Sequence, residues 1–282
     1  MPAGLRVTVE AIPGTPLPHG ILGTSCITVT DVTEEEIHEL NGVEWLAVGC
    51  CPVRDWPDPC EAEPPGEESP GPAPRKEFCR PVTEHAAPIT VYAGSECSTL
   101  GWKYEEARAH AEATLALGEQ AALEAAFWRT KLVADAEDIT PTGGPVSVAQ
   151  GVARLEGCLA RSYAGVGTLH LPVDVAALLD RDVLREDPDT GALGTLAGNC
   201  AVIGAGYSLM NTGPGNIPAE DGTAWLYITG PLAIRRGPAD TIPDKAGASV
   251  NYRTNDRKVL VERTYVVGTT CTVCAIQVRT LD

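Results

Sequence analysis

The sequence predicts an α+β protein, and three observations lead to this prediction. Residues 102–133 form one segment rich in Ala, Leu, Glu and Gln, which is typical of a long helix. Stretches with alternating or β-branched apolar residues, such as 223–229 and 259–267, follow it and are typical of strands. Prolines crowd residues 52–74, where each removes a backbone donor and fixes φ, so this segment is expected to be a long exposed loop.

The composition is that of a globular protein with a substantial core. The chain has 282 residues, of which 44% are hydrophobic. Its formal net charge is -17, from 21 basic and 38 acidic residues, which argues against direct wrapping of nucleic acid, because clustered Lys and Arg neutralise phosphates. No apolar run reaches the roughly 18 residues of a membrane span, and residues 1–20 lack the features of a signal peptide. We therefore expect the chain to fold in the cytosol.

The first part of the chain is predicted to be extended. Short apolar stretches at 5–12, 27–32 and 43–50 predict strands or an extended arm, and a Gly- and Pro-rich segment separates the first two. Between the second and third, TEEEIHEL begins with Thr33 and has Glu36 three positions later. This spacing is typical of the capping box at the start of a short helix.

The long helix at 102–133 is expected to span about 45 Å, at about 1.5 Å per residue. Acidic residues lie near its start and basic residues near its end, an order that suits the helix dipole. Small or apolar residues recur along it at steps of three, four or seven, and this stripe predicts a close neighbour along the whole helix. The stripe consists of Ala107, Ala111, Leu115, Ala122, Ala125 and Trp128.

The remainder of the chain is predicted to mix helices and strands. The expected helices are 144–163 and 173–184, and the expected strands are 165–172, 199–207 and 223–237, the last broken at Gly230 and Pro231. Two final strands are expected to pair with each other through a turn around Gly268.

Ten cysteines allow disulfides without requiring them, and any bridges are expected before residue 100, where six of the ten lie. Near the other end, Cys271 and Cys274 form a C-T-V-C pair. In a strand, residues an odd number apart point to opposite faces, so the two could not share a metal ion there. The residues after Cys274 are rich in β-branched types and predict no helix that would lower a thiol pKa. We interpret both as packing cysteines in a strand.

Two further segments resemble the beginnings of known binding loops. Gly204-x-Gly206 follows a strand as in a dinucleotide-binding fingerprint, but Leu209 occupies the third glycine position and a turn is expected next. DPDTG at 187–191 resembles the start of a calcium loop, but Gly198 stands where a bidentate Glu belongs. A strand end and a solvated turn are the favoured interpretations.

The remaining polar candidates do not form a catalytic motif. The five histidines, which are His19, His38, His85, His110 and His170, stand singly. We expect His110 on a helix surface and His170 in a strand. Arg235 and Arg236 either meet an acidic neighbour across an interface or end a strand in solvent, and the second is favoured. The sequence thus predicts no catalytic, cofactor-binding or metal-binding residues.

Several stretches resemble those of major capsid proteins of tailed bacteriophages, of the actinobacterial phage type. The resemblance covers roughly residues 85–280, and the stretches are ITVYAGSECSTLGW leading into YEEARAHAEATLALGEQAALEAAFW, AVIGAGY with NTGP, AWLYITGPLAIRRG, and VLVERTYVVGTTC. The resemblance implies the Hong Kong 97-like fold, which encapsulins share. Its parts would be an N-terminal arm (1–53), an extended loop (54–98), a peripheral domain (99–143 and 224–282) with a spine helix at 102–133, and an axial domain (144–223).

The resemblance also implies a function without catalysis. The chain would assemble with itself into pentamers and hexamers of an icosahedral head shell that encloses DNA without sequence-specific binding and without a membrane. It would be located in the virion capsid, assembled in the host cytoplasm. Contacts with scaffolding, portal and decoration proteins stay open; many such proteins carry an N-terminal scaffolding segment, whereas this chain begins with the arm. The alternatives are a tail or decoration component, an encapsulin-type nanocompartment shell and, less favoured, a cytosolic α/β enzyme.

Overall fold

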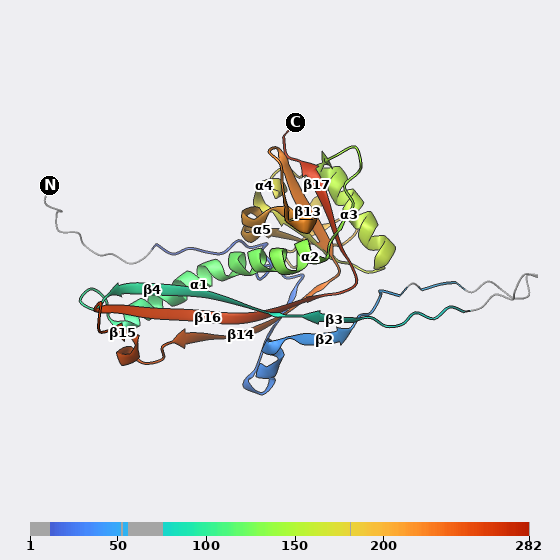
Figure 1. The fold of residues 1–282 in the computed structure, drawn as a ribbon. Coiled ribbons are helices and arrows are strands. Elements are labelled where there is room, and N and C mark those ends of the chain that lie inside the picture. The colour runs from blue at the N-terminus through green and yellow to red at the C-terminus, as the bar shows by residue number, and fades with distance from the viewer. Residues whose placement is uncertain (1–11, 52, 56–75, 181, 282) are drawn as a thin grey trace, which may run out of the picture.

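The computed structural model describes residues 12–51, 53–55, 76–180 and 182–281. It contains a long narrow sheet and a compact mixed sheet, and one long helix lies along the first and ends against the second (Figure 1). The α+β prediction is therefore confirmed. The predicted stretch at 5–12 and most of the proline-rich segment at 52–74 lie outside the described residues.

The predicted long helix is present. It consists of α1 (Tyr104–Phe127), a π-helical turn (Trp128–Leu132) and α2 (Val133–Asp135). Its start is fixed by a capping interaction, because the Lys103 N–H donates to Glu106 Oε2 at 2.7 Å.

The predicted stripe on this helix is correct for Ala107, Ala111, Leu115 and Trp128, which are buried, and wrong for Ala122; Ala125 is half-buried. Ala107 and Ala111 are buried, whereas Ala122 is exposed and its neighbour Glu124 is buried. The cause is a change of neighbour: α1 packs on strands β4 (Pro88–Ser98) and β16 (Asp256–Thr269) and then on helix α5 (Ala205–Met210). A Cβ at Gly206 of α5 would lie 2.1 Å from the Ala121 carbonyl oxygen, so only glycine permits this approach. The buried face thus rotates partway along the helix.

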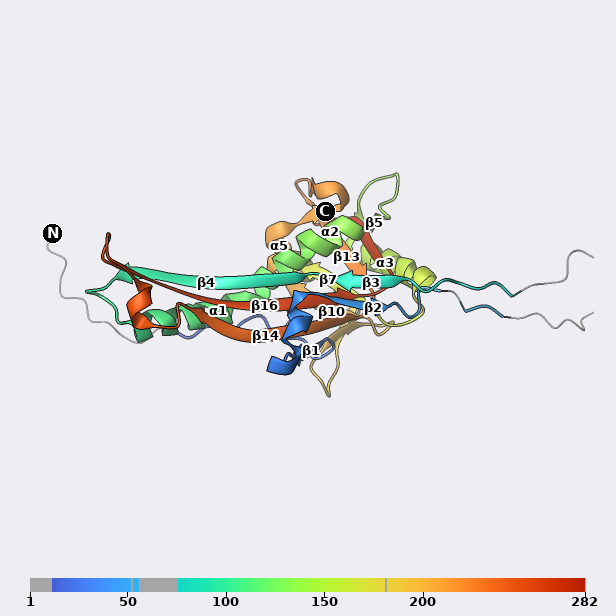
Figure 2. The same ribbon diagram turned by 60° about the horizontal axis from the view of Figure 1, so that its bottom comes forward.

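The long sheet has the strand order β1-β14-β16-β15, with β4 also paired to β16. Its strands are β1 (Thr28–Asp31), β4 (Pro88–Ser98), β14 (Leu232–Ile242), β15 (Val250–Asn251) and β16 (Asp256–Thr269). β16 is antiparallel to both β4 and β14, and β1 joins the edge of β14 in parallel. Figure 2 shows β4, β16 and β14 side by side along the length of the molecule.

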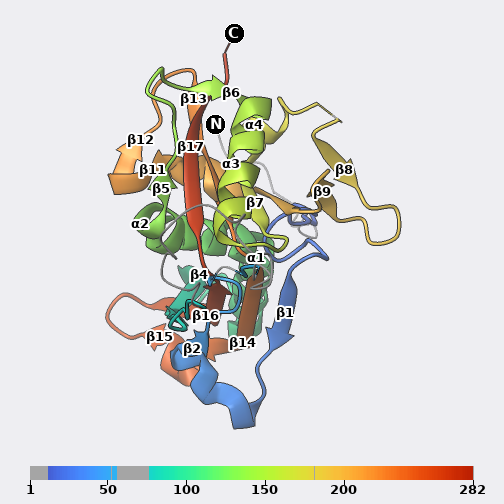
Figure 3. The same ribbon diagram turned by 90° about the vertical axis from the view of Figure 1, so that its right-hand side faces the viewer.

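The mixed sheet has the order β5-β17-β13-β7-β10-β9-β8, with β6 also paired to β17. Its strands are β5 (Glu137–Asp138), β6 (Val146–Ser147), β7 (Thr168–Pro172), β8 (Leu184–Glu186), β9 (Leu193–Thr195), β10 (Cys200–Gly204), β13 (Thr223–Thr229) and β17 (Val273–Arg279). Its helices are α3 (Val148–Ser162), α4 (Val173–Ala176) and α5 (Ala205–Met210). In Figure 3 this sheet stands above the long sheet, and the β8–β9 hairpin projects from its side.

The structure corrects how the last strands are grouped. β13 and β17 pair with each other, and β13 also pairs with β7, so both belong to the mixed sheet and not with the strands that pack on α1. The final two strands, β16 and β17, therefore do not pair through a turn around Gly268. After Thr223 the chain instead crosses between the sheets twice, between Thr229 and Leu232 and between Thr269 and Val273. The predicted helix at 173–184 is only the four residues of α4.

A two-stranded ribbon, β2 (Val43–Leu46) with β3 (Thr83–Ala86), lies at the opposite end of the long sheet from β15 (Figure 1). The predicted short helix is the 3-10 helix η1 (Glu34–Asn41), with its capping box at Thr33 and Glu36. The remaining short elements are β11 (Thr212–Gly213), η3 (Pro214–Asn216), β12 (Ile217–Pro218) and η4 (Ala246–Ser249).

Two large hydrophobic clusters form most of the core, and a small third cluster joins Tyr104, Ala107 and Val259. One large cluster lies where the long helix meets both sheets and includes Trp128, Tyr207 and Tyr265, and the other lies between α3 and the mixed sheet. Among the described residues, none of the helices is both long and apolar enough to cross a membrane.

Candidate functional site

The two cysteines of the C-T-V-C motif lie at the second crossover, and each forms a disulfide with a cysteine elsewhere in the chain. Cys274 is buried in β17 and is joined to Cys158 of α3, whereas Cys271 precedes the strand with a φ of 70° and is joined to Cys50. The interpretation as packing cysteines in a strand is thus confirmed for Cys274, which is buried in β17, and wrong for Cys271, which lies before the strand. The sequence could not show the two disulfides, because the partners are 116 and 221 residues away along the chain.

Two further disulfides join Cys51 to Cys79 and Cys26 to Cys200. Only the first of these lies wholly before residue 100, so the expectation that bridges gather there is correct for one pair of the four described. Cys97 on β4 is a free thiol, and Cys60 lies outside the described residues.

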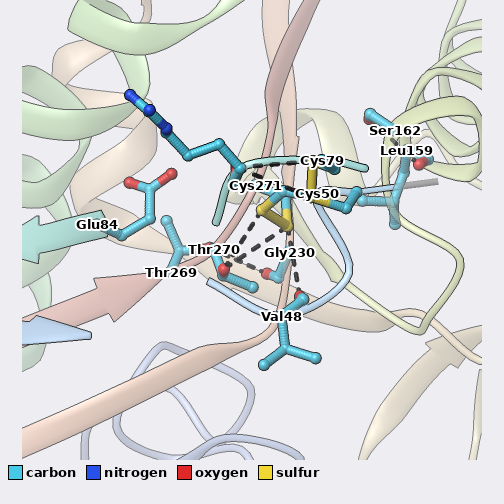
Figure 4. The surroundings of a disulfide bond; sticks show 12 residues. Val48, Cys50, Cys79, Glu84, Leu159, Ser162, Gly230, Thr269, Thr270 and Cys271 are labelled. Carbon is cyan, nitrogen blue, oxygen red and sulfur yellow. Dashed lines mark hydrogen bonds between the residues drawn. A yellow bond between two sulfur atoms is a disulfide. The ribbon is translucent and has the colours of Figure 1, made fainter. Parts of the chain in front are cut away.

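The ribbon β2–β3 meets the two crossovers at what we call the loop root, residues 47–51 and 79–82. In Figure 4 the Cys50–Cys271 bridge lies beside Val48, Thr270 and Gly230. The Sγ of Cys271 is 3.5 Å from the Val48 carbonyl oxygen. A Cβ at Gly230 would lie 2.3 Å from the Thr270 carbonyl oxygen, so the two crossovers pass at backbone contact. The loop root is therefore fastened where the two sheets are joined.

An apolar groove of about 450 Å³ adjoins the loop root. Trp45, Leu46, Tyr163 and Val266 are among the residues that line it. Leu46 is 64% exposed and Val48 is 81% exposed, so the chain leaves apolar surface open here. Exposed apolar patches of this kind are typical of protein interfaces.

The N-terminal arm is held against the second half of α1 by two buried polar side chains. Glu124 accepts the Ile21 N–H and the Gly206 N–H, each at 3.0 Å. Gln120 accepts the Leu22 N–H at 3.2 Å and donates to the arm through its amide. Burial raises the pKa of Glu124 to about 7, although its two backbone hydrogen bonds oppose the shift. One carboxyl group of α1 therefore joins the N-terminal segment at Ile21 to helix α5.

His170 lies in β7, as predicted, and is fully buried. Its Nδ1 shares a hydrogen bond of 2.9 Å with the Tyr207 hydroxyl, and its Nε2 shares one of 3.1 Å with Thr229 Oγ1. Burial lowers the pKa of His170 to about 3, so the ring is neutral at physiological pH. A neutral imidazole with both nitrogens occupied has a packing role, not that of a base facing a substrate.

The two arginines at 235 and 236 differ from the prediction. They lie inside β14, which continues to Ile242, and they do not end a strand. Arg236 forms a bidentate pair with Asp31, at 2.6 and 3.0 Å, and Arg235 pairs with Glu39 at 2.7 Å. The guanidinium of Arg236 lowers the pKa of Asp31. Both arginines therefore fasten the arm to the long sheet.

The two loops that resemble binding motifs have structural roles. The helix that follows Gly204 has only six residues and uses Gly206 for its approach to α1. The Asp187 carboxylate accepts the N–H groups of Asp189 and Thr190, which holds the β8–β9 turn.

The other histidines do not converge on a shared site. His110 is on the exposed surface of α1, as predicted, where it shares a hydrogen bond with Ser95. Within the described ranges, no group of three His, Cys, Asp or Glu side chains is arranged to hold a metal ion.

Comparisons with known proteins identify the fold. No family model matches the chain, and no curated protein matches it. Among solved structures, a chain from Microbacterium phage Oxtober96 aligns with a TM-score of 0.53 at 10% identity, over 97% of this chain and 95% of that one. The capsid of Ralstonia phage GP4 aligns with a TM-score of 0.52 at 10% identity, over 100% and 96%. The capsid of a native GTA particle aligns with a TM-score of 0.50 at 12% identity, over 95% and 100%. The chain therefore has the fold of phage capsid proteins.

Proposed function

We propose that this chain is a major capsid protein, which assembles with itself into the icosahedral head shell around phage DNA. The observation that supports the proposal most is the likeness to the capsid of Ralstonia phage GP4, which covers both chains almost completely. The function that this likeness implies is assembly and not catalysis: each subunit must make the same contacts with its neighbours so that closed rings form. The exposed apolar surface at the loop root is consistent with such contacts.

The proposal extends to the parts of a Hong Kong 97-like subunit. Strands β14, β15 and β16 of the long sheet, together with α1, are the peripheral domain, and the mixed sheet with α3, α4 and α5 is the axial domain that surrounds each ring axis. The arm and the extended loop add β1 and β4 to the long sheet. This division moves β13 and β17 to the axial domain. Residues 1–53 are the arm, and residues 54–98 the extended loop, of which only 54–55 and 76–98 are described.

The charge suits a container for DNA. A subunit with a net charge of -17 repels phosphate, so packaged DNA is enclosed without being bound by sequence or retained on the wall. The partners proposed are other copies of this chain in pentamers and hexamers, together with scaffolding, portal and decoration proteins.

Negative-stain microscopy of the expressed protein, alone and with candidate scaffolding proteins, tests the proposal. Closed shells or rings of five and six subunits are expected. Tubes would indicate a tail component instead. Particles isolated from infected cells that contain protein and lack DNA would indicate a nanocompartment. A compact monomer in analytical ultracentrifugation, under all salt conditions and with scaffolding present, would overturn the proposal.

A further inference from the structure

Three of the disulfides form a series through the loop root. Cys51–Cys79 ties the two chains of the ribbon together, and the adjacent Cys50 ties the same segment to Cys271 at the crossover. Three residues further on, Cys274 is tied to Cys158 of α3. Adjacent cysteines with different partners thus connect the ribbon, the crossover between the sheets and the mixed sheet.

The bridges in this series differ in access to solvent. Cys158 is 5% exposed and Cys274 is 0% exposed, so solutes cannot readily reach that bridge in the folded chain. Cys79 is exposed, and Cys50, Cys51 and Cys271 are partly exposed. Thiol–disulfide exchange requires direct attack on a sulfur atom, so access favours reaction at the two loop-root bridges.

Non-covalent contacts also restrain this end of the ribbon. The Ala47 N–H donates to the Val82 carbonyl at 2.8 Å, and Gly49 packs on the Tyr163 ring, where a Cβ would lie 2.7 Å from the ring. An exposed ion pair joins Arg54 to Glu77, and exposed ion pairs of this type contribute little. The Cys50–Cys271 bridge adds a covalent tie between the loop root and the crossover, so its state changes how firmly the loop root is held there.

We propose that the Cys50–Cys271 and Cys51–Cys79 pairs are a redox-controlled clamp, open as thiols during assembly and closed as disulfides in the finished particle. The open form leaves the ribbon free to adjust against the crossover, and the closed form fixes it. The inference rests on the proposed function in one respect: a shell subunit is made in a reducing cytosol and the particle later leaves it, and disulfides persist only in oxidising surroundings.

The reaction at each pair is an ordinary exchange with a low-molecular-weight disulfide as oxidant, of the class of oxidised glutathione. One cysteine thiolate attacks the oxidant, forms a mixed disulfide and releases one small thiol. The second cysteine, after losing its proton, attacks the protein sulfur of the mixed disulfide and releases the other small thiol. Two protein thiols are oxidised to one disulfide, and one small disulfide is reduced to two thiols.

The first test maps the thiols by mass spectrometry. Expressing cells are quenched with N-ethylmaleimide before lysis, and a second sample is purified and treated with oxidised glutathione. We expect maleimide on Cys50, Cys51, Cys79 and Cys271 in the quenched sample, and the linked pairs Cys50–Cys271 and Cys51–Cys79 in the oxidised sample. Linked pairs already present in the quenched cells, or different pairings after oxidation, would overturn the clamp.

The second test measures hydrogen exchange at the Ala47 amide in the folded protein, oxidised and reduced. Opening the clamp should speed exchange by about tenfold or more, because the hydrogen bond to Val82 is no longer flanked by covalent ties. The double variant C50S/C51S, which removes both ties, should exchange rapidly in both states, whereas C97S, which removes the free thiol on β4, should behave as wild type. If the double variant fails to fold, reduction of the wild type still gives the comparison. Equal exchange in oxidised and reduced wild type would contradict the proposal.

Both tests work on unassembled subunits. A subunit that never forms particles but shows the expected thiol map and exchange would refute the capsid function alone. Particles whose loop-root pairs are already bonded in the cytosol would refute the clamp alone.

Discussion

The two halves of helix α1 are buried by different chemistry. In the first half, Ala107, Ala111 and Leu115 present small apolar side chains toward the long sheet. In the second half, Gln120 and Glu124 are buried beside the apolar Leu123 and Phe127, and they accept backbone N–H groups from the arm and from α5. Apolar contacts tolerate small shifts of the packed elements, whereas hydrogen bonds fix one alignment of the two partners. Where one partner is a carboxyl group, the interaction can also respond to pH. The difference teaches that one helix can pack on a sheet at one end and set the position of separate segments at the other.

The largest effect on stability is expected where the second half of α1 lies in backbone contact with α5. Gly206→Val places a side chain where even a Cβ would lie 2.1 Å from the Ala121 carbonyl oxygen. Because the contact is between the backbones of α1 and α5, no side chain can move aside to make room. We therefore expect the free energy of unfolding to fall by about 4 kcal/mol. Chemical denaturation measures it. Gly118→Val on α1, where a Cβ has no neighbour within 4 Å, is the control and should unfold near the wild-type midpoint.

The second-largest effect is a pH dependence of stability that comes from Glu124 in the second half of α1. Burial raises the pKa of Glu124 from 4.5 to about 7. Below about pH 4.5 the carboxyl is neutral in the folded and unfolded chains. As the pH rises toward 7 the unfolded chain ionises first, so stability falls, and the full penalty of about 3 kcal/mol is present above pH 7.

Glu124→Gln should remove this component, so the difference in unfolding free energy between wild type and variant should change by about 3 kcal/mol from pH 4.5 to 8. Denaturation at a series of pH values measures it, and the slope matters more than the absolute value because the amide loses one acceptor. Ala113→Gln, on the exposed face of α1, introduces an amide without removing a carboxyl group and should keep the wild-type slope. Parallel curves for wild type and Glu124→Gln would show that Glu124 does not titrate in this range.

The sequence was sufficient for elements that follow from local pattern. The long helix, the break at Gly230 and Pro231, and the capping box at Thr33 are all where they were expected. It was insufficient for grouping strands, because β13 and β17 carry the same apolar pattern as β14 and β16. Which sheet a strand joins depends on where the chain crosses between the sheets. In the sequence, the first crossover is visible only as the break at Gly230 and Pro231.

The candidate site was harder to predict because its residues look ordinary in sequence. Glu124 and Gln120 are common in exposed helices, and periodicity assigned burial to Ala122 instead. Their burial depends on the arm, which comes from 103 residues away. Cysteine spacing likewise cannot define pairings. One signal was available: the two glycines on either side of Ala205, Gly204 and Gly206, lie at a close approach to α1.

A third prediction separates the apolar half from the expected stripe. Ala111→Trp should overpack the seam against the long sheet and lower stability by about 1–3 kcal/mol, because Ala111 is fully buried. Ala122→Trp should change stability by less than about 0.5 kcal/mol, because that side chain is exposed. Thermal denaturation of the two variants side by side measures both. Equal destabilisation would mean that the buried face does not rotate along the helix.

The smallest effect concerns the junction of the two halves, where Gly118 is exposed on α1 and a Cβ would have no neighbour within 4 Å. Within one subunit, Gly118→Ala should raise the unfolding free energy by about 0.5–1 kcal/mol, because alanine loses less conformational freedom than glycine in a helix. The melting temperature of unassembled protein measures this. If glycine is also needed for a neighbouring copy to approach α1, the same variant should form fewer particles although its subunit is more stable. A subunit destabilised by Gly118→Ala would instead show that the helix bends at this position, and the two halves would then be two helices and not one spine.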